Sequence, residues 1–236
     1  MKILIYGKEV DKIKLELLAH GFQIVESNPD AVVCYGGDGT LLHAEYTYPG
    51  VLKLPLRNSK VGKLCAAEPI GEVLRKFITG KYKIAKIPKL EFELSHKKHF
   101  ALNDVIIANK KRVHAIRYVV RINEKLYAKG REIIGDGIVV ATPFGSGAYY
   151  RSITDGTFSV GIGLAFNNST ESVDHVVLKD TDLIEFEITR GEAVVAADID
   201  ELGCLNVGDK LTISKSKKES AKIATFGEEF SYWAND

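Results

Sequence analysis

One acidic residue lies inside a run of glycines, in the segment Gly36-Gly37-Asp38-Gly39-Thr40. Glycines allow anionic oxygens to approach the backbone closely, and exposed N–H groups at such a turn can face phosphate. A carboxylate beside phosphate is repulsive unless it holds a metal ion or takes a proton from an acceptor group. Both roles predict phosphoryl transfer. The alternative is a tight turn in which Asp38 only caps the following helix.

A second segment, residues 135–149, reads Gly-Asp-Gly-Ile-Val-Val-Ala-Thr-Pro-Phe-Gly-Ser-Gly-Ala-Tyr. It predicts a strand, a turn rich in Pro, Gly and Ser, and a short helix through Ser152. Such a turn can offer backbone donors, the Ser146 hydroxyl and an aromatic face to a nucleotide. By itself it only suggests a binding site, because many Gly/Ser loops do no more than turn the chain. Walker and G-x-G-x-x-G patterns are absent, which disfavours P-loop and ordinary Rossmann sites.

The elements that would carry these segments follow two patterns along the chain. Up to about residue 82, apolar runs separated by helical stretches predict strands that alternate with helices. Strands are expected at 2–6, 22–25, 31–35 and 51–56, and helices at 9–20 and 68–79. This pattern is typical of a parallel sheet covered on both faces. Period-two runs then predict antiparallel strands at 90–94, 113–122 and 184–188. We therefore expect an α/β domain in residues 1–82 and an all-β sandwich domain in residues 83–222.

Together the two segments resemble the NAD kinase family, which pairs a G-G-D-G-T loop with D-G-x-x-x-x-T-P-x-G-S-x-A-Y. Asn103-Asp104 matches the family's intermediate N-[DE] motif, and Gly62 with Leu64 is similar to its weaker G-x-L element. The motifs keep the family's order over roughly residues 36–156. The resemblance implies an α/β domain with a parallel sheet plus a β-sandwich, with residues 223–236 returning to the first domain.

The resemblance also implies an activity. NAD kinases transfer the terminal phosphate of ATP, or of polyphosphate, to the 2′-hydroxyl of the adenosine ribose of NAD, which gives NADP. Asp38 would be the general base. Mg²⁺ or another divalent cation is expected with the donor, held mainly by phosphates and water, and no dedicated metal cluster is expected in the protein. Active members of the family are usually homodimers or homotetramers, so a homo-oligomer is expected here.

The resemblance assigns individual residues to the phosphates and to NAD. Phosphate contacts are implied for Gly36, Gly37, Gly39 and Thr40. NAD contacts are implied for Asp38, Gly39, His43, Asn103, Asp104, Arg131, Asp136, Gly147, Ala148, Tyr149, Tyr150, Arg151 and Ser152. The chain departs from the family pattern at Gly147, where Thr is common, and at Ile134, where a basic residue is frequent, so Arg131 is expected to serve instead.

The composition of the chain disfavours nucleic-acid-binding, membrane and secreted proteins. The chain of 236 residues is 45% hydrophobic and carries a formal net charge of +1, which is ordinary for a globular protein and gives no electrostatic footprint for nucleic acid. No apolar run approaches the roughly eighteen residues of a membrane span, and the N-terminus lacks a signal-peptide pattern. A cytoplasmic protein without membrane or nucleic-acid partners is expected.

Several polar or reactive residues are interpreted as structural. The cysteines are expected to be free, mostly buried thiols: Cys34, Cys65 and Cys204. The lysines at 81, 83, 86, 89, 97 and 98 are interpreted as solvated strand faces and turns, and His96 and His99 as exposed. Trp233 is expected to pack the C-terminal tail.

Two other functions remain as alternatives at this point. Lipid kinases share the G-G-D-G-T loop and phosphofructokinases a close relative of it, but the T-P-x-G-S-x-A-Y match favours NAD. A non-enzymatic NAD(P)-binding regulator would keep the pocket and lose the transfer, and the intact Asp38 argues against it. The phosphoryl donor, the choice between NAD and NADH, and the subunit number stay open.

Overall fold

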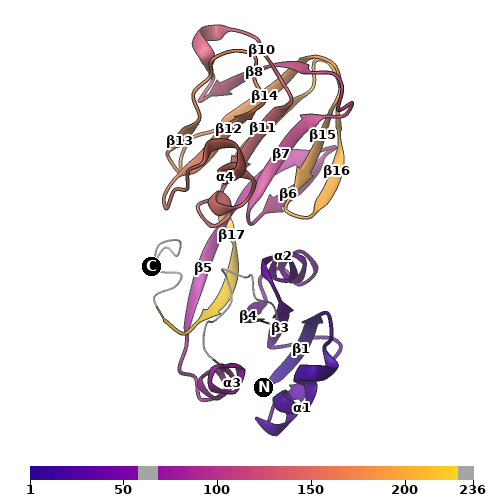
Figure 1. Cartoon of the computed structure of the whole chain (residues 1–236), viewed down its shortest axis with the longest axis vertical. Coiled ribbons are helices and arrows are strands. Elements are labelled where there is room, and N and C mark those ends of the chain that lie inside the picture. Colours follow the sequence, from indigo (N-terminus) through magenta and orange to yellow (C-terminus); the bar gives the residue numbers. More distant parts are fainter. Residues whose placement is uncertain (58–68, 228–236) are drawn as a thin grey trace. The chain divides into compact units, whose positions relative to one another are not determined.

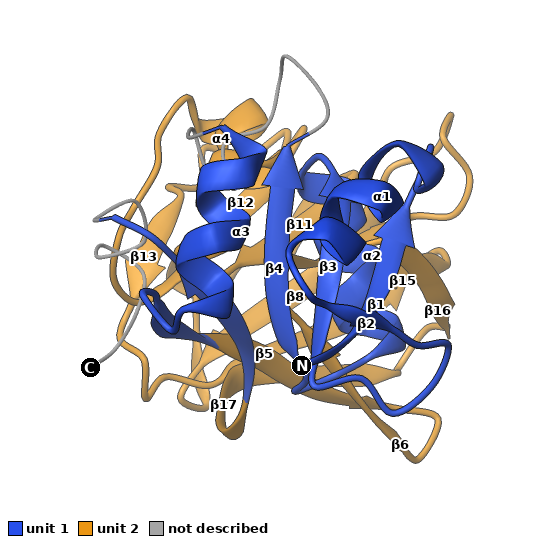
Figure 2. Ribbon diagram, turned by 90° about the horizontal axis from the view of Figure 1, so that it is seen from below, with its two compact units in different colours: residues 1–87, 220–236 blue, residues 88–219 orange. Residues whose placement is uncertain are grey.

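The computed structural model describes residues 1–57 and 69–227, in which the chain forms two units. Unit 1 contains Met1–Ile87 and the C-terminal part from Ser220, and unit 2 contains Pro88–Glu219 (Figure 2). Two long strands, β5 (Lys83–Leu94) and β17 (Lys210–Thr225), run through the boundaries between them. The domain boundaries predicted after residues 82 and 222 stay predictions. The Gly62–Leu64 element, Cys65 and Trp233 lie outside the described residues.

Unit 1 is built on a parallel sheet, as the alternating pattern predicts. Its strands run in the order β2-β1-β3-β4-β17, and every pair is parallel (Figure 1). Their bounds are β1 (Lys2–Gly7), β2 (Gln23–Ile24), β3 (Ala31–Gly36) and β4 (Leu52–Arg57), with Lys222 and Ile223 of β17 beside β4. Because neighbouring strands are parallel, β1 and β3 end at the same edge, with Gly7 opposite Tyr35.

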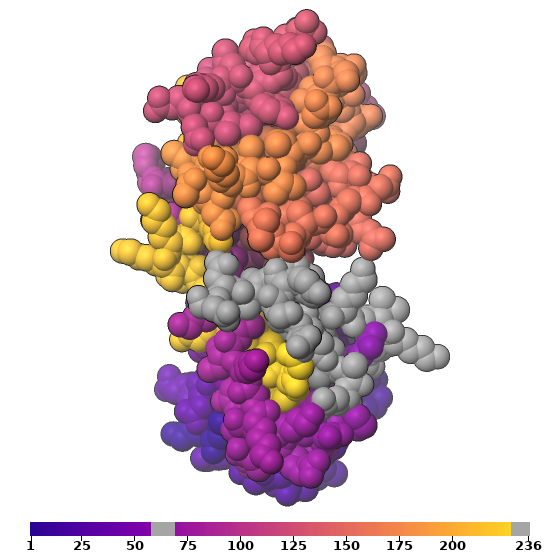
Figure 3. Space-filling view, turned by 90° about the vertical axis from the view of Figure 1, so that its left-hand side faces the viewer, coloured from indigo at the N-terminus to yellow at the C-terminus, as the bar shows by residue number. Residues whose placement is uncertain are grey.

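Three helices flank this sheet: α1 (Asp11–Ala19), α2 (Asp38–Thr47) and α3 (Ile70–Ile78) (Figure 2). Apolar side chains of α1 and α3 join one buried cluster with alternate residues of the strands, such as Ile3, Val33 and Leu54. Helix α2 contacts β1, β3 and β4 through buried residues outside that cluster. The other side of α3, drawn in purple, lies on the surface of unit 1 (Figure 3).

Unit 2 contains two antiparallel layers, as the period-two runs predict. One is a six-stranded sheet in the order β13-β12-β11-β7-β15-β16. Its strands are β7 (Asp104–Asn109), β11 (Gly137–Ala141), β12 (Ile162–Asn167), β13 (Val176–Leu178), β15 (Ala193–Ala197) and β16 (Asp200–Leu205). The other contains β8 (Ile116–Ile122), β9 (Lys125–Leu126), β10 (Ile133–Gly135) and β14 (Ile184–Arg190), joined by β17, β5 and β6 (Lys97–Ala101).

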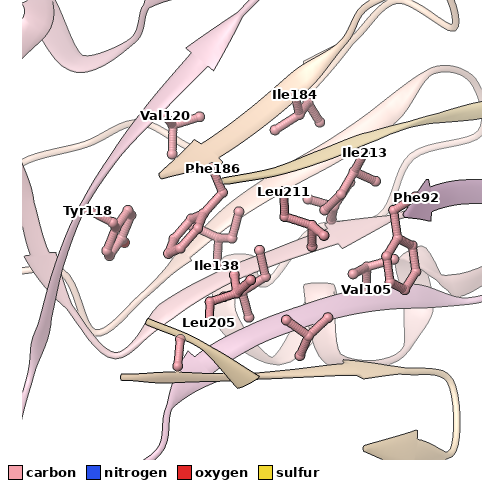
Figure 4. Packing of buried hydrophobic residues seen from close by; sticks show 14 of the residues in the cluster. Phe92, Val105, Tyr118, Val120, Ile138, Ile184, Phe186, Leu205, Leu211 and Ile213 are labelled. Carbon is pink, nitrogen blue, oxygen red and sulfur yellow. The ribbon is translucent and has the colours of Figure 1, made fainter. Parts of the chain in front are cut away.

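Side chains from the two layers of unit 2 form its core. Phe186 and Tyr118 stack with ring centroids 4.9 Å apart, and they pack in one buried cluster with Val105 and Ile138 of the other sheet (Figure 4). Short helical segments follow the strands: η1 (Ala128–Gly130), η2 (Phe144–Gly147) and α4 (Tyr149–Thr154). The predicted NAD-binding segments lie at the ends of β7 and β11 of this sandwich.

Several local predictions are corrected by the structure. Strand β8 begins at Ile116 instead of Val113, because Asn109 donates its side-chain N–H to the carbonyls of Lys111 and His114 and thereby fixes a turn. Val113 lies in that turn and is 87% exposed. Cys204 is exposed, whereas Cys34 is buried.

Two side chains interpreted as solvated are at least partly buried. His99 is half-buried and stacks on Phe92 at a centroid distance of 5.4 Å, and Lys89 is only 5% exposed. A strand that crosses a packed layer alternates between its two faces, and one face can be covered by an element distant in sequence.

No helix among residues 1–57 and 69–227 is long and apolar enough to cross a bilayer.

Candidate active site

The glycine-rich loop of unit 1 joins a buried strand to a helix. Strand β3 ends at Gly36 and α2 begins at Asp38, with Gly37 as the helix cap in an extended conformation (φ −117°, ψ −166°). Asp38 is therefore the first residue of the helix and does not occupy the cap position. The first N–H groups of a helix have no partner within it, and the helix dipole places partial positive charge there. The half-buried Asp38 carboxylate consequently lies at an end of the helix that favours anions.

The glycines of this loop differ in what a side chain would meet. A Cβ at Gly36 would lie 2.2 Å from the Thr40 hydroxyl oxygen, so Gly36 is required by its packing against the first turn of α2. A Cβ at Gly39 would meet nothing within 4 Å among the described residues. Packing therefore explains Gly36, whereas the phosphate contact of Gly39 stays a prediction.

A cleft of about 700 Å³ opens in unit 1 beside the loop. Gly36, Gly37, Thr40 and His43 line one part of it, and Gly7 and Lys8 at the end of β1 line another. The sequence-based assignment missed Gly7 and Lys8. Their sequence signal is a glycine followed by a lysine at the end of the first strand. In a parallel sheet the end of β1 lies beside the end of β3, so these two residues lie near the glycine-rich loop. The two loop residues between Gly37 and Thr40, Asp38 and Gly39, do not line the cleft.

In unit 2 the two predicted NAD-binding motifs touch each other. Thr142 donates its backbone N–H to the Asn103 carbonyl at 2.8 Å and its hydroxyl to the Leu102 carbonyl at 2.7 Å. The Gly145 N–H donates to the Thr142 hydroxyl at 3.0 Å, and a Cβ at Gly145 would lie 2.2 Å from the Asn103 carbonyl oxygen. The Pro/Gly/Ser turn therefore packs directly on the Asn103-Asp104 backbone, and only glycine fits at position 145.

The two residues of the intermediate motif have unusual polar surroundings. The Asn103 Oδ1 atom is buried and has no hydrogen-bond partner among the described residues. Asp104 is 4% exposed, and burial, then the nearby charge of Asp198, raise its pKa from 3.8 to about 7. Burial raises the pKa of Asp198 as well, although its carboxylate accepts N–H groups from Leu102 and Asn103, which favour the ionised form. Asp104 therefore holds a proton below neutral pH.

This carboxyl pair predicts how stability depends on pH. Between pH 4 and 7 the folded chain retains a proton on Asp104 that the unfolded chain has released, so the free energy of unfolding falls as pH rises. The contribution is on the order of a few kcal/mol and is lost as pH passes about 7. Urea unfolding at pH 5 and pH 7.5 should show a smaller difference for Asp104→Asn than for wild type. Equal differences would contradict the raised pKa.

Asp136 lies in a second cluster, at the other end of β7 and β11. Its two carboxylate oxygens accept the side-chain N–H groups of Asn109 and Asn168, each at 2.9 Å. Asn167 donates to the Tyr149 hydroxyl at 3.1 Å. Residues Asp104 and Asn109 are the two ends of β7, about 17 Å apart at roughly 3.4 Å per residue, so the structure does not bring Asp136 together with Asp104. The three asparagines were not predicted as site residues.

The remaining predicted residues differ in exposure. Tyr149 is 37% exposed, whereas Tyr150 is 5% exposed and packs edge-on against Phe158 at 5.0 Å. The Ser146 hydroxyl, expected to face a nucleotide, is buried and donates to the carbonyls of Pro143 and Phe158. Exposed positions are Gly147, Ala148, Arg151 and Ser152.

Two further features bear on ligands. Arg131 lines a separate cavity of about 650 Å³ in unit 2, together with Tyr127, Lys129 and Glu171. Within the two described ranges, no group of three or more His, Cys, Asp or Glu side chains is arranged to hold a metal ion.

Known proteins with similar sequences are NAD kinases. No family model matches the chain. An NAD kinase of Sulfurisphaera tokodaii is 31% identical over 225 residues, which cover 87% of this chain and 85% of that protein. An NAD kinase of Thermomicrobium roseum is 26% identical over 243 residues, covering 93% and 82% respectively. The similarity extends beyond the short motifs to most of the chain.

Solved structures show the same fold. An NAD kinase from Archaeoglobus fulgidus in complex with ATP matches with a TM-score of 0.81 at 21% identity, over 98% of this chain and 96% of that chain. A yeast NADH kinase complexed with NADH matches with a TM-score of 0.84 at 17% identity, over 97% and 84%. The predicted α/β domain plus β-sandwich is confirmed by these matches and by the observed sheets. With 31% identity to the Sulfurisphaera tokodaii enzyme over most of both chains, this chain belongs to the NAD kinase family.

Proposed function

We propose that this member of the NAD kinase family transfers the terminal phosphate of ATP to the 2′-hydroxyl of the adenosine ribose of NAD. The observation that carries the proposal is the position of the glycine-rich loop. It lies at the carboxyl edge of a parallel sheet, where ligands of open α/β sheets bind, and it presents a carboxylate at the first residue of α2. The A. fulgidus relative was solved with ATP, which favours ATP over polyphosphate as the donor.

The cleft of unit 1 has the chemistry to hold the phosphates of the donor. Backbone N–H groups at the start of α2 and the helix dipole favour anions, and the Lys8 ammonium supplies a positive charge from the end of β1. His43 supplies a further polar ring on the next turn of α2. These groups stabilise the negative charge on the transferred phosphoryl group without forming a covalent bond to it.

Asp38 is the proposed general base. In the reaction the ribose 2′-hydroxyl gives its proton to the Asp38 carboxylate, and its oxygen forms a bond to the γ-phosphorus. The bond between the γ-phosphorus and the β–γ bridging oxygen breaks, and ADP leaves. An aspartate is a weak base, but in a loose transition state it needs only to accept the proton as the new bond forms.

A divalent cation fits the available ligands when the donor contributes most of them. Mg²⁺ usually keeps several waters and takes one or two carboxylates together with substrate phosphates. Among the described residues, Asp38 places a carboxylate in the glycine-rich loop, and no group of three or more His, Cys, Asp or Glu side chains is arranged to hold a metal ion. Bound with the donor, the cation would neutralise charge on the β- and γ-phosphates.

The Asn103-Asp104 segment is the proposed binding site for the adenosine part of NAD. The unpartnered Asn103 Oδ1 can accept a hydrogen bond from an amino group, and the Asp104 carboxyl can bond to ribose hydroxyls. The partly exposed Tyr149 ring can lie against a base. Asp136, which precedes β11, and Arg131, which lines the separate cavity, are proposed to contact other parts of the dinucleotide or the NAD of a second copy.

Replacing Asp104 should weaken NAD binding more than it slows the chemical step. We expect Asp104→Ala to raise the KM for NAD about tenfold, because a hydrogen bond between the carboxyl group and the ribose is lost, with the KM for ATP changed less than twofold. Asp104→Asn keeps the shape and one acceptor oxygen, so its effect should be smaller. Steady-state kinetics measure both values, and an unchanged KM for NAD in Asp104→Ala would refute the contact.

One assay tests the proposed activity directly. Purified protein is incubated with NAD, Mg²⁺ and either ATP or polyphosphate, and NADP is measured by a coupled dehydrogenase. Parallel reactions offer NADH, a diacylglycerol or a sugar phosphate in place of NAD. NADP formation with ATP supports the proposal. Binding of NAD without turnover under either donor would instead favour a regulator, and phosphorylation of the lipid alone would favour a lipid kinase.

A further inference from the structure

Asp198 lies in the turn between β15 and β16 and bonds to a segment far away in the sequence. Its carboxylate accepts the backbone N–H groups of Leu102 and Asn103, each at 2.7 Å, and of Asp104 at 3.3 Å. Its own N–H donates to the Asp104 carbonyl at 3.1 Å. Asp198 adopts a left-handed conformation (φ 52°) that is uncommon for a residue other than glycine. One side chain therefore gathers three consecutive N–H groups of the intermediate motif.

The same segment is held from its other side by the Pro/Gly/Ser turn. Thr142 bonds to the carbonyls of Leu102 and Asn103, whereas Asp198 bonds to the N–H groups of these two residues. The donors and acceptors of the Leu102-Asn103 backbone are thus satisfied by two separate elements. With the backbone fixed in this way, the Asn103 and Asp104 side chains are presented in defined directions.

Burial and the neighbouring groups have opposite effects on the Asp198 carboxyl. Burial raises the pKa of Asp198, while the three N–H bonds and the charge of Lys89 act in the opposite direction. Lys89 comes from β5 and is 5% exposed, although its sequence context indicated a solvated strand face. Asp104, on the motif itself, is a further titratable group that faces Asp198. A partly buried carboxylate is kept here because it accepts these N–H groups.

We propose that Asp198 is a positioning residue of the NAD site, which holds the Leu102–Asp104 backbone so that Asn103 and Asp104 can bind the nucleoside. This inference rests on the proposed function of the Asn103-Asp104 segment. It assigns Asp198 no contact with the reacting atoms. Its removal should act on NAD binding through the motif and should leave the donor site of unit 1 unchanged.

A graded pair of variants tests the inference. Asp198→Asn retains one acceptor oxygen, and Asp198→Ala retains none. We expect the Kd for NAD, measured by titration calorimetry, to rise about tenfold in Asp198→Ala and less in Asp198→Asn, since bonds to a charged acceptor are lost. The KM for ATP should change less than twofold. Asp209→Asn is the matched control, because Asp209 accepts a backbone N–H from Asn206 in another turn of unit 2; its Kd for NAD should equal that of wild type.

A double-mutant cycle separates positioning from general stability. In an Asn103→Ala background the effect of Asp198→Asn on the Kd for NAD should shrink to less than half, because the side chain being positioned is already gone. Equal effects in both backgrounds, or an unchanged Kd in Asp198→Ala that still folds by circular dichroism, would overturn the inference. If wild type neither binds nor phosphorylates NAD, the proposed function fails instead, and the two failures are thereby distinguished.

Discussion

Asp38→Asn should lower the kcat for NADP formation by about 10²- to 10⁴-fold, which is the usual contribution of a positioned general base. The amide is nearly the same size as the carboxylate and keeps the first position of α2, but it cannot accept the ribose proton. Binding does not need that proton transfer, so the Kd for NAD should stay within a few fold. Rapid-quench or steady-state kinetics with NAD and ATP, together with calorimetric titration of NAD, measure the two effects separately.

The chain offers a matched control for this substitution. Asp11 is the first residue of α1, as Asp38 is the first residue of α2, and it lies on the surface of unit 1 outside the cleft. Asp11→Asn removes the same charge from an equivalent helix position, and kcat should remain that of wild type. Full activity in Asp38→Asn would mean that another group takes the proton. A loss of NAD binding equal to the loss of kcat would make Asp38 a binding residue.

Lys53→Met should cost about 3–5 kcal/mol of unfolding free energy, which is typical when one partner of a buried ion pair is removed. Lys53 is fully buried in β4, and its ammonium donates to the Glu45 carboxylate and to the carbonyls of Tyr48 and Val51, the last at 2.8 Å. Methionine has a similar length and keeps the packing, but it leaves Glu45 charged and 3% exposed. Urea unfolding followed by circular dichroism gives the difference.

Two further variants show whether charge is the cause. Adding Glu45→Gln to Lys53→Met removes the uncompensated charge and should recover a large part of the loss. Lys12→Met breaks an ion pair with Glu9 whose side chains are 65% and 57% exposed, so it should lower the free energy of unfolding far less than Lys53→Met does. A Lys53→Met protein as stable as wild type would show that the buried pair contributes nothing. The pair joins β4 to α2, the helix that begins at Asp38.

Local patterns were sufficient for much of unit 1. The strands expected at 2–6 and 31–35 and the helix expected at 9–20 lie within two residues of β1, β3 and α1. Each is an uninterrupted apolar or helical pattern next to glycine, and such signals act between near neighbours in the chain. The glycine loop was likewise placed correctly between a strand and a helix, because its residues are consecutive.

Only the folded chain could show which distant residues meet. Asp198 reaches Leu102 across 96 residues, and Lys8 lies beside the glycine loop because β1 pairs with β3. A period-two pattern indicates that alternate side chains share a face, but it does not indicate which strands pair or which element covers each face. For that reason Lys89 was interpreted as solvated.

The sequence by itself therefore determined the chemistry that its consecutive residues can perform: a carboxylate between glycines, and an Asn-Asp pair that precedes an apolar strand. The tertiary structure decided which backbone holds that pair, which cation lines the cleft and which end of the sheet carries Asp136. The physical reason is that hydrogen bonds and burial depend on distance in space, and strand pairing brings together residues that no local pattern connects.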